Sequence, residues 1–525
     1  MGPNNSHPLA AKSEAGGLSW GAIFVLLTLF LVRGFILAAV MPPFEGWDEY
    51  QHLGYIDHCA TSDERAVFQE AKLDGSFLRA VSHFPRADEV PLAGYGAATY
   101  SQYWISGLLP ARGNGPSILY EAQQPPLYYR LMAPVYRFYG GRANLRLVVS
   151  ILRLINVGFG ALALGLVLWW IRGNVPQFLG LAMGCWVAFQ PLLLLNVMRV
   201  ANDALAYLLG TAVVVVLLAR RGNYFWLQAV LLAVLLPMAL LAKSTNVTLL
   251  PVIAAALAIG IWRREIRPAQ ALGAAALILG LGAVLTGSYF YFNLRHFGVL
   301  TPMQETVMNQ QAHRHVLHIL TAMPLRFWLR TTTTLWVFQA LWIGGWSFLR
   351  MPHIPMDFYI GILFLSAVSL AAGVLTRRGR SRLPIDWPRL LIMLLVLACV
   401  ECGLMYHAAE SYSAWSGVIA TNPWYAALAI PWWLIVLAAG VWTLPWTWVR
   451  LALLWAMPMV CLIAELYGLL VRMIPFYSAT SLGEKALRRL AMLHPTGMGM
   501  SALSIAAVIE AGLLILLTAL ACKRS

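Results

Sequence analysis

Residues 18–40 read LSWGAIFVLLTLFLVRGFILAAV, a mostly apolar run that is long enough to cross the hydrocarbon core of a bilayer as one helix. Similar runs recur from end to end of this 525-residue chain, in which 60% of residues are hydrophobic and 11% are charged. They lack the alternation of polar and apolar residues that marks the strands of a transmembrane barrel. The first run is too long for a signal-peptide core and no cleavage site follows it, so we expect a retained anchor. The sequence therefore predicts an all-α polytopic membrane protein.

Apolar runs and basic loops together predict about twelve (11–13) transmembrane helices, with residues 1–525 forming a single transmembrane domain. Two loops are long. Residues 41–142 are expected to carry juxtamembrane helices, and residues 293–356 have room for a thirteenth segment within RFWLRTTTTLWVFQALWIGGW. The expected spans lie near residues 18–40, 143–171, 177–198, 204–219, 224–241, 247–262, 269–292, 357–376, 388–407, 425–443, 448–471 and 501–521.

The net charge of +15 is explained first by the topology of a membrane protein, and it does not by itself indicate a ligand. Basic clusters in short loops mark the cytoplasmic side of a membrane protein, so both long loops are expected on the outer side and both termini inside. The same clusters remove the reason to expect a nucleic-acid partner. They are Arg172, Arg220–Arg221, Arg263–Arg264, Arg377 to Arg382 and Lys523–Arg524.

Several classes of protein are disfavoured by what the sequence contains. There are six cysteines, and only Cys59 falls in a loop expected outside, which argues against a disulfide framework. Cys399 and Cys402 form a CxxC inside an apolar run, where plain packing is the simpler interpretation. No GxxxxGK[ST] motif occurs, which disfavours an ATP-driven pump or an enzyme with a nucleotide-binding module.

The segment PPFEGWDEYQHLGY, residues 42–55, places Glu45, Asp48, Glu49 and His52 directly after the first span. A helix N-terminus needs only one acid as a cap, and that is the structural alternative for Asp48 or Glu49. His52 lies four residues after Asp48, on the same face of a helix. An acid beside a histidine can act as a general base. The pair also permits a Mg²⁺ or Mn²⁺ site, with Asp48 and His52 as candidate ligands, without requiring one.

Two further segments place polar residues on the side expected to face outward. YEAQQPPLYYRLMAPVYRFYG, residues 120–140, closes the first long loop and contains Glu121, Gln124, Tyr128 and Tyr129; an interfacial amphipathic helix would also explain it. NVMRVANDALAYLLG, residues 196–210, places Asp203 at the outer junction of two spans, where a helix cap is the alternative.

Basic residues in two other segments favour an anionic ligand. Lys243 lies in LLAKSTNVTLLP at an outer junction, where it either extends toward water or holds a phosphate as a point charge. Arg295 and His296 lie in YFNLRHFGVLTP, which is followed by QAHRHVLH and makes an outer loop basic against the positive-inside trend. A phosphate leaving group needs fixed positive charge of this kind.

The order of these motifs resembles the GT-C superfamily of integral-membrane glycosyltransferases. The likeness covers residues 18–300 and rests on DE after the first span, PPLYY, ND opening a later span, LAKS, and YFNLRHFG. It is greatest to members that depend on polyprenyl-phosphate sugars, namely the protein O-mannosyltransferases and the lipid A aminoarabinose transferase. The resemblance implies a GT-C-like bundle in the bacterial inner membrane. It also implies inverting transfer of a sugar from a polyprenyl-phosphate donor to an envelope lipid, glycan or protein on the periplasmic face.

The resemblance also assigns roles to residues. It implies that Asp48 is catalytic with support from Glu49 and that Lys243 binds the donor phosphate. From their positive charge, Arg295 and His296 are expected to bind the same phosphate. The residues expected to contact the acceptor or sugar are Glu45, His52, Glu121, Gln124, Tyr128, Tyr129, Asp203 and Tyr425.

The chain departs from the family pattern at several of these positions. Gln124 stands where relatives often have Lys or His, and Gln123 where some have Glu, which weakens the case for a metal site built from those groups. Gln51 stands where an Arg follows the DE pair in relatives. Trp424–Tyr425 only half matches an Arg-Tyr pair.

Three other interpretations of the sequence stay open. A transporter of an anionic or lipid-linked substrate would explain the charged residues inside spans, but it predicts inverted repeats and a site near the middle of the bilayer. An O-antigen ligase or polymerase would share the large outer loop and use a diphosphate donor. A non-catalytic GT-C-like relative would explain the glutamines before PPLYY.

Overall fold

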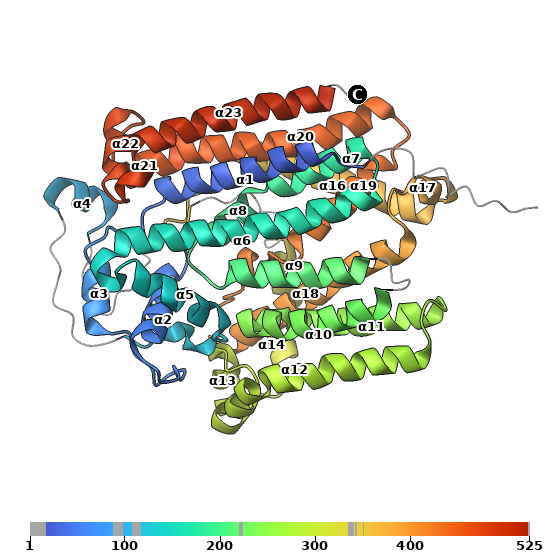
Figure 1. Cartoon of the computed structure of the whole chain (residues 1–525), viewed down its shortest axis with the longest axis horizontal. Coiled ribbons are helices and arrows are strands. Elements are labelled where there is room, and N and C mark those ends of the chain that lie inside the picture. Colours follow the sequence, from blue (N-terminus) through green and yellow to red (C-terminus); the bar gives the residue numbers. More distant parts are fainter. Residues whose placement is uncertain are drawn as a thin grey trace, which may run out of the picture.

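The computed structural model describes residues 17–87, 98–107, 117–219, 224–333, 341, 344–349 and 351–522. In this part of the chain every extended element of regular structure is a helix, and no strand forms. Figure 1 shows the long helices running along one common direction in a single elongated bundle. The predicted all-α polytopic fold class is confirmed.

Among the described residues, nine helices are long and apolar enough to cross a membrane. Helices α7 (Gln177–Ala188) and α8 (Pro191–Met198) would form a tenth span if taken together, with a bend of 52° between them. Helices α9 (Asp203–Leu218) and α19 (Ile430–Trp442) are apolar but shorter. The expected total of twelve spans is therefore not confirmed. The nine are α1 (Trp20–Val40), α6 (Leu145–Asn174), α10 (Phe225–Ala242), α11 (Leu249–Trp262, with the preceding turn Ser244–Thr248), α12 (Pro268–Phe297), α16 (His353–Leu375), α18 (Trp387–Ala414), α20 (Thr447–Tyr467) and α23 (Met500–Cys522).

Most of the short helices gather at one end of the bundle, which we call the loop end (Figure 1). Helix α17 (Arg377–Arg382), in one of the basic clusters, lies at the opposite end. Arg220–Arg221, Lys523–Arg524 and residues 334–340 and 342–343 of the expected thirteenth segment lie outside the described residues. The short helices are α2 (Glu49–Thr61), α3 (Gly75–Val81), α4 (Tyr100–Ser106), α5 (Leu127–Phe138), α13 (Gln304–Gln311), α14 (Val316–Ala322), α15 (Leu325–Thr333), α21 (Ile474–Ser478) and α22 (Glu484–Ala491).

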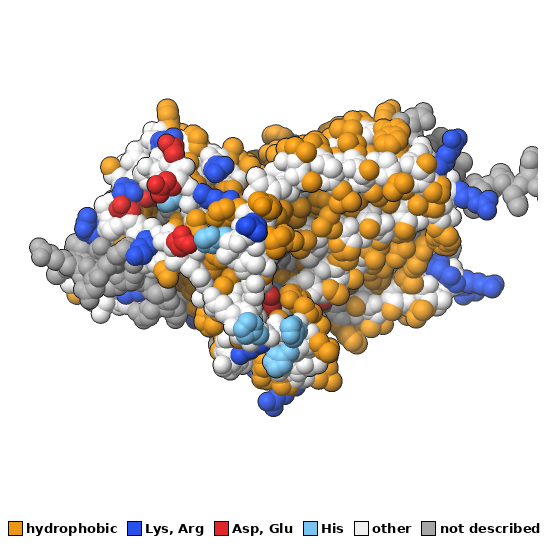
Figure 2. All heavy atoms as spheres, turned by 90° about the horizontal axis from the view of Figure 1, so that it is seen from below, with side chains coloured by type: hydrophobic (Ala, Val, Ile, Leu, Met, Phe, Trp, Pro, Cys, Tyr) orange, Lys and Arg blue, Asp and Glu red, His pale blue; other side chains and the backbone are white. Residues whose placement is uncertain are grey.

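The surface of the bundle is suited to lipid. Figure 2 shows a broad hydrophobic region over the long helices, with acidic, histidine and basic side chains together at the loop end and only Lys and Arg side chains among the charged ones at the opposite edge. Large apolar side chains of α12 point outward, among them Leu272 and Val284, which are 73% and 77% exposed. Spanning helices satisfy their own backbone hydrogen bonds, so such side chains are stable against hydrocarbon.

The charged side chain inside the first span is paired. Arg33 in α1 is buried and forms an ion pair with Glu465 in α20, and it also donates to the carbonyl oxygen of Ala188. Glu510 of α23 lines the same small cavity. An unpaired charge at this depth would be costly, so this pair ties α1 to α20 within the bundle.

Helices α16 and α19 approach each other closely at Gly440. A Cβ atom at Gly440 would lie 2.6 Å from the Cβ of Leu370 and 2.8 Å from the carbonyl oxygen of Ser366. Both contacts involve the main chain or its nearest side-chain atom, so they cannot be relieved by rotating a side chain. Glycine is therefore required here by the distance between the two helices.

We expect Gly440→Ala to lower the midpoint of thermal unfolding in detergent, because overpacking costs about 1–3 kcal/mol. Gly361→Ala in α16 is the matched control, since nothing lies within 4 Å of its Cβ position. Alanine forms helices better than glycine, so the control should keep or raise the midpoint. Equal midpoints for the two variants would contradict the close approach.

Candidate active site

Titratable side chains from separate chain segments meet at the loop end of the bundle and form what we call the polar cluster. Each lies at or near the end of a helix or in a short turn. Asp203 begins α9 and Lys243 directly follows α10, and these are the helix ends at which the macrodipole favours an acid and a base respectively. The cluster consists of Asp48, His52, Glu121, Arg199, Asp203 and Lys243.

Asp203 binds both cations of the polar cluster. One carboxylate oxygen lies 2.6 Å from the Nζ of Lys243, and the other lies 2.6 Å from a guanidinium nitrogen of Arg199. The three side chains are buried. Arg199 also donates to the carbonyl oxygen of Trp47 at 2.6 Å. The Nζ of Lys243 lies 4.9 Å from the ring centroid of Tyr425, so this tyrosine faces the cluster as well.

Asp48 is the carboxylate of the polar cluster with no direct partner among the described residues. It precedes α2 at the N-cap position, but its side chain accepts no capping hydrogen bond. Its φ of 55° is left-handed, a conformation that aspartate tolerates better than most residues. Burial raises the pKa of Asp48 to about 6, against the opposing effect of Arg199 and Lys243. At pH 7 it is therefore mostly ionised and more basic than an ordinary aspartate.

Glu49, the next residue, is fully buried, and both of its carboxylate oxygens have hydrogen-bond partners, unlike those of Asp48. Its oxygens accept from Arg153 in α6 at 2.6 and 2.8 Å, and from the backbone N–H groups of Phe44 and Val200 at 2.8 and 2.9 Å. Arg153 also donates to the carbonyl oxygen of Pro42 at 2.7 Å. Glu49 thus joins the end of α1, the start of α2, helix α6 and the segment before α9.

His52, Tyr129 and Glu121 form a buried network beside Asp48. The Nδ1 of His52 lies 2.8 Å from the hydroxyl of Tyr129, which donates to Glu121 at 3.4 Å. Burial holds the pKa of His52 well below its usual value, and Arg199 lowers it further. Burial and the nearby Asp48 raise the pKa of Glu121 well above its usual value. The surroundings thus favour the neutral form of both groups.

Other residues expected at the site hold the surrounding segments together. Glu45 accepts from the hydroxyls of Tyr100 and Tyr477 and from the backbone N–H of Ser347, which joins α4, α21 and residues 344–349. Tyr128 accepts a hydrogen bond from Asn156 at 2.9 Å. Gln124 accepts from Asn202, next to Asp203, at 3.4 Å.

Arg295 and His296 are not brought into the polar cluster. Both lie on the exposed last turn of α12, where His296 pairs with the exposed Glu70 at 2.9 Å. Two arginines that do hold the site together, Arg153 and Arg199, are missing from the residues chosen in the sequence. The sequence signal that could have found Arg153 is a charge within an apolar run, and the signal for Arg199 is its position four residues before Asp203.

The candidate metal ligands Asp48 and His52 belong to no larger ligand group among the described residues, in which no three or more His, Cys, Asp or Glu side chains are placed to hold an ion. Asp203 is already bound by two cations, and the Nδ1 of His52 is engaged by Tyr129. We therefore derive no chemical step through a metal.

Comparisons with known proteins give distant similarities. No protein-family model and no curated protein sequence matches the chain. Among solved structures, it is similar to the apo oligosaccharyltransferase of Archaeoglobus fulgidus, with 11% identity, a TM-score of 0.43 and 88% of this chain covered; it spans 57% of the length of that protein. It is also similar to ArnT from Cupriavidus metallidurans bound to undecaprenyl phosphate, with 13% identity, a TM-score of 0.48, and 95% and 76% of the two chains covered.

We expect Glu49→Gln to destabilise the protein by about 3–5 kcal/mol, because it leaves the guanidinium of Arg153 buried without a counterion. The change should appear as a clear fall in the thermal unfolding midpoint of the detergent-solubilised protein. Glu484→Gln removes the carboxylate of an exposed pair with Arg488 and serves as the control, with an expected effect of about 1 kcal/mol or less. A Glu49→Gln midpoint that matches this control would argue against the structural role.

Proposed function

We propose that this protein is an inverting glycosyltransferase that moves a sugar from a polyprenyl-phosphate donor to a hydroxyl group of an envelope acceptor. The observation that carries the proposal is Asp48. It is a half-buried carboxylate with a raised pKa and no direct partner among the described residues, and it lies close enough to Arg199 and Lys243 to feel both charges. A basic carboxylate beside fixed positive charge suits attack by a hydroxyl on a carbon that carries a phosphate.

In this mechanism Asp48 accepts the proton of the acceptor hydroxyl. The acceptor oxygen forms a bond to the anomeric carbon of the sugar from the face opposite the phosphate. The bond between that carbon and the phosphate oxygen breaks, and its electron pair leaves with the lipid phosphate. A single displacement of this kind inverts the configuration at the anomeric carbon.

The charge balance of the polar cluster supports the leaving-group half of this reaction. When ionised, Asp48 and Asp203 together balance Arg199 and Lys243. Once Asp48 takes up a proton, Asp203 balances only one of the two cations, and one positive charge is left uncompensated. The leaving phosphate gains one negative charge at the same moment, and the uncompensated positive charge can stabilise it. We assign phosphate binding to Lys243 and Arg199, and a structural role to Glu49.

We infer the class of donor from the absence of one sequence motif and from the position of the polar cluster. The sequence contains no nucleotide-binding motif of the P-loop type, whereas a lipid-linked donor needs none. The polar cluster lies at helix ends near the membrane boundary, where a lipid phosphate would sit. The basic loops at the other end favour the cytoplasmic side there, so we propose that the site faces the periplasm of a bacterial inner membrane.

A transporter is less well supported by this geometry. A transported substrate would be expected to bind near the middle of the bilayer, between interrupted helices. Asp203 and Lys243 instead lie at the ends of α9 and α10, and the intramembrane Arg33 is paired with Glu465.

Asp48→Asn is expected to reduce turnover of a synthetic polyprenyl-phosphate sugar by about 10²–10⁴-fold while donor binding is retained, because the amide cannot accept the proton. Donor consumption by the purified protein is the measurement, with donor binding followed by calorimetry. Lys243→Met is the comparison variant. It should weaken donor binding, because it removes one of the two cations to which we assign phosphate binding. If wild type neither binds nor consumes any such donor, the glycosyltransferase proposal fails.

The pH profile supplies a separate check on Asp48. The base must be ionised to accept a proton, and its pKa is raised to about 6. We therefore expect kcat/KM to fall about tenfold per pH unit below pH 6 and to level off above it. The residual activity of Asp48→Asn should lack this acidic limb. A wild-type limb near pH 4 would identify a solvent-exposed carboxylate instead.

A further inference from the structure

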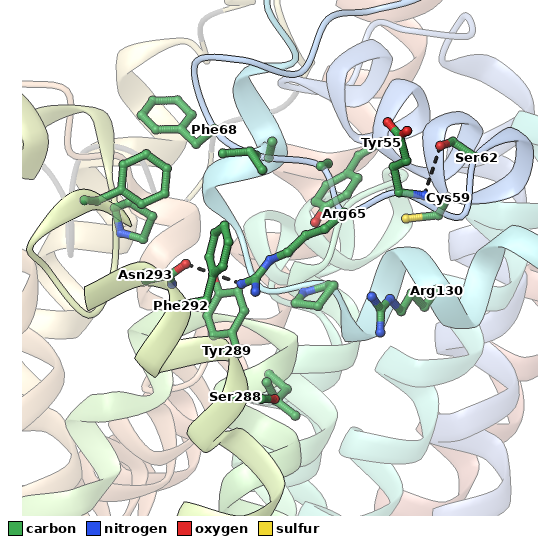
Figure 3. Close-up of a pocket in the computed structure, with 18 of the residues that line it drawn as sticks. Tyr55, Cys59, Ser62, Arg65, Phe68, Arg130, Ser288, Tyr289, Phe292 and Asn293 are labelled. Atoms are coloured by element: carbon green, nitrogen blue, oxygen red, sulfur yellow. Dashed lines mark hydrogen bonds between the residues drawn. The ribbon is translucent and has the colours of Figure 1, made fainter. Parts of the chain in front are cut away.

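A cavity of about 410 Å³ lies at the loop end, and Figure 3 shows the side chains that line it. It is enclosed by α2 and the segment that follows it, by α5, and by the ends of α10 and α12. None of the residues that line the cavity belongs to the polar cluster. The two are nevertheless neighbours, because Ala122 lines the cavity and the preceding residue, Glu121, belongs to the cluster. Its principal lining residues are Tyr55, Arg65, Arg130, Leu241, Tyr289 and Phe292.

Two guanidinium groups point into this cavity. Arg65 lies over the ring of Phe292, 3.7 Å from its centroid, and reaches the side-chain oxygen of Asn293 at 3.5 Å. Figure 3 shows Arg130 pointing into the cavity from α5. Among the described residues, neither arginine forms an ion pair with a carboxylate. Asp63 and Glu64 also line the cavity, and they are exposed, as Arg130 is, so solvent screens these three charges; Arg65 is half-buried and is screened less.

The charges of the two arginines reach the same region of the cavity. Burial lowers the pKa of Arg65, and the nearby Arg130 lowers it further. Both guanidiniums also oppose the rise that burial causes in the pKa of Tyr55. Two guanidinium groups that line one cavity, and that form no ion pair among the described residues, suit the planar, multidentate recognition that arginine gives to phosphate.

The opposite wall of the cavity belongs to the membrane-spanning helices. Leu241 lies near the end of α10, and Leu285 and Ser288 lie on α12. The side chain of Leu285 is 43% exposed, and that of Val284 beside it is 77% exposed. An acyl or prenyl chain can therefore continue from the cavity along the outside of α12, while its headgroup meets the arginines.

Two stacked tyrosine rings lie between part of the cavity and the polar cluster. Tyr55 lines the cavity and stacks on Tyr129 at 4.0 Å between ring centroids. Tyr129 in turn bonds to His52 of the polar cluster. A donor phosphate is attached directly to the anomeric carbon, so it must lie within the cluster beside Asp48. An anion in this cavity is several bonds farther from the reacting atom and belongs to a different molecule.

We infer that this cavity binds the phosphate-bearing headgroup of a lipid acceptor. The inference rests on the proposed function and narrows its acceptor from lipid, glycan or protein to an anionic lipid. Arg65 and Arg130 bind the phosphate, Leu241 and Leu285 contact the start of the hydrocarbon chain, and the hydroxyl that attacks the sugar lies at the far end of the headgroup.

The test titrates dioctanoyl phosphatidic acid into the purified full-length protein by calorimetry, with inorganic phosphate and uncharged dioctanoylglycerol in parallel. Arg65→Gln and Arg130→Gln are each expected to weaken binding of phosphatidic acid about tenfold. Arg326→Gln is the matched control, because Arg326 also lies over an aromatic ring, that of Phe327, but outside the cavity. Ser288→Trp fills the cavity from an exposed position on α12 and should block the lipid without removing a charge.

Binding of a polyprenyl-phosphate sugar should be unchanged in all four variants. Equal losses of donor and phosphatidic acid binding would overturn the inference, because the cavity would then hold the donor. Absence of phosphatidic acid binding to wild type, or equally tight binding of inorganic phosphate, would overturn it too. Arginine-dependent lipid binding without any donor turnover would instead defeat the proposed function and with it the acceptor role, leaving an anionic-lipid site.

Discussion

The buried ion pair between Glu49 and Arg153 is the interaction on which the loop end depends. Taking both charges out of water is expensive, and the pair is stable because its remaining hydrogen-bonding groups are also satisfied. Backbone N–H groups of Phe44 and Val200 donate to the carboxylate, and the guanidinium donates to the carbonyl oxygen of Pro42. Segments from α1, α2, α6 and the start of α9 are thereby held at one point, next to the residue that we propose as the base.

Asp48 and Glu49 show how surroundings separate two adjacent carboxylates. Glu49 points into a site where every oxygen is bonded, whereas Asp48 adopts a left-handed backbone conformation and is left without a direct partner among the described residues. The resemblance to membrane glycosyltransferases treats the two as one acidic motif. The structure assigns them different surroundings, and only the unpaired one can accept a proton from a substrate.

The loop end has two compartments with one wall in common. Lys243, Arg199 and Asp48 face the polar cluster, while Arg65 and Arg130 face the cavity beyond Tyr55 and Tyr129. Each compartment has its own pair of cations, and the cavity also touches the membrane through α10 and α12. Under the function and the acceptor that we propose, this arrangement would let two lipid-anchored substrates approach from the bilayer with their phosphates apart.

The sequence by itself determined the class of fold, because a helix needs about twenty apolar residues to cross a bilayer and these runs can be seen directly. It also singled out Asp48, Asp203 and Lys243, since charged residues at the ends of apolar runs are uncommon. The tertiary structure alone decided which of these are paired, and it placed Arg153 and Arg199 beside them and left Arg295 and His296 outside. Charges interact through space over a few ångströms, and Glu49 and Arg153 are 104 residues apart in the chain, so no local pattern could reveal the pair.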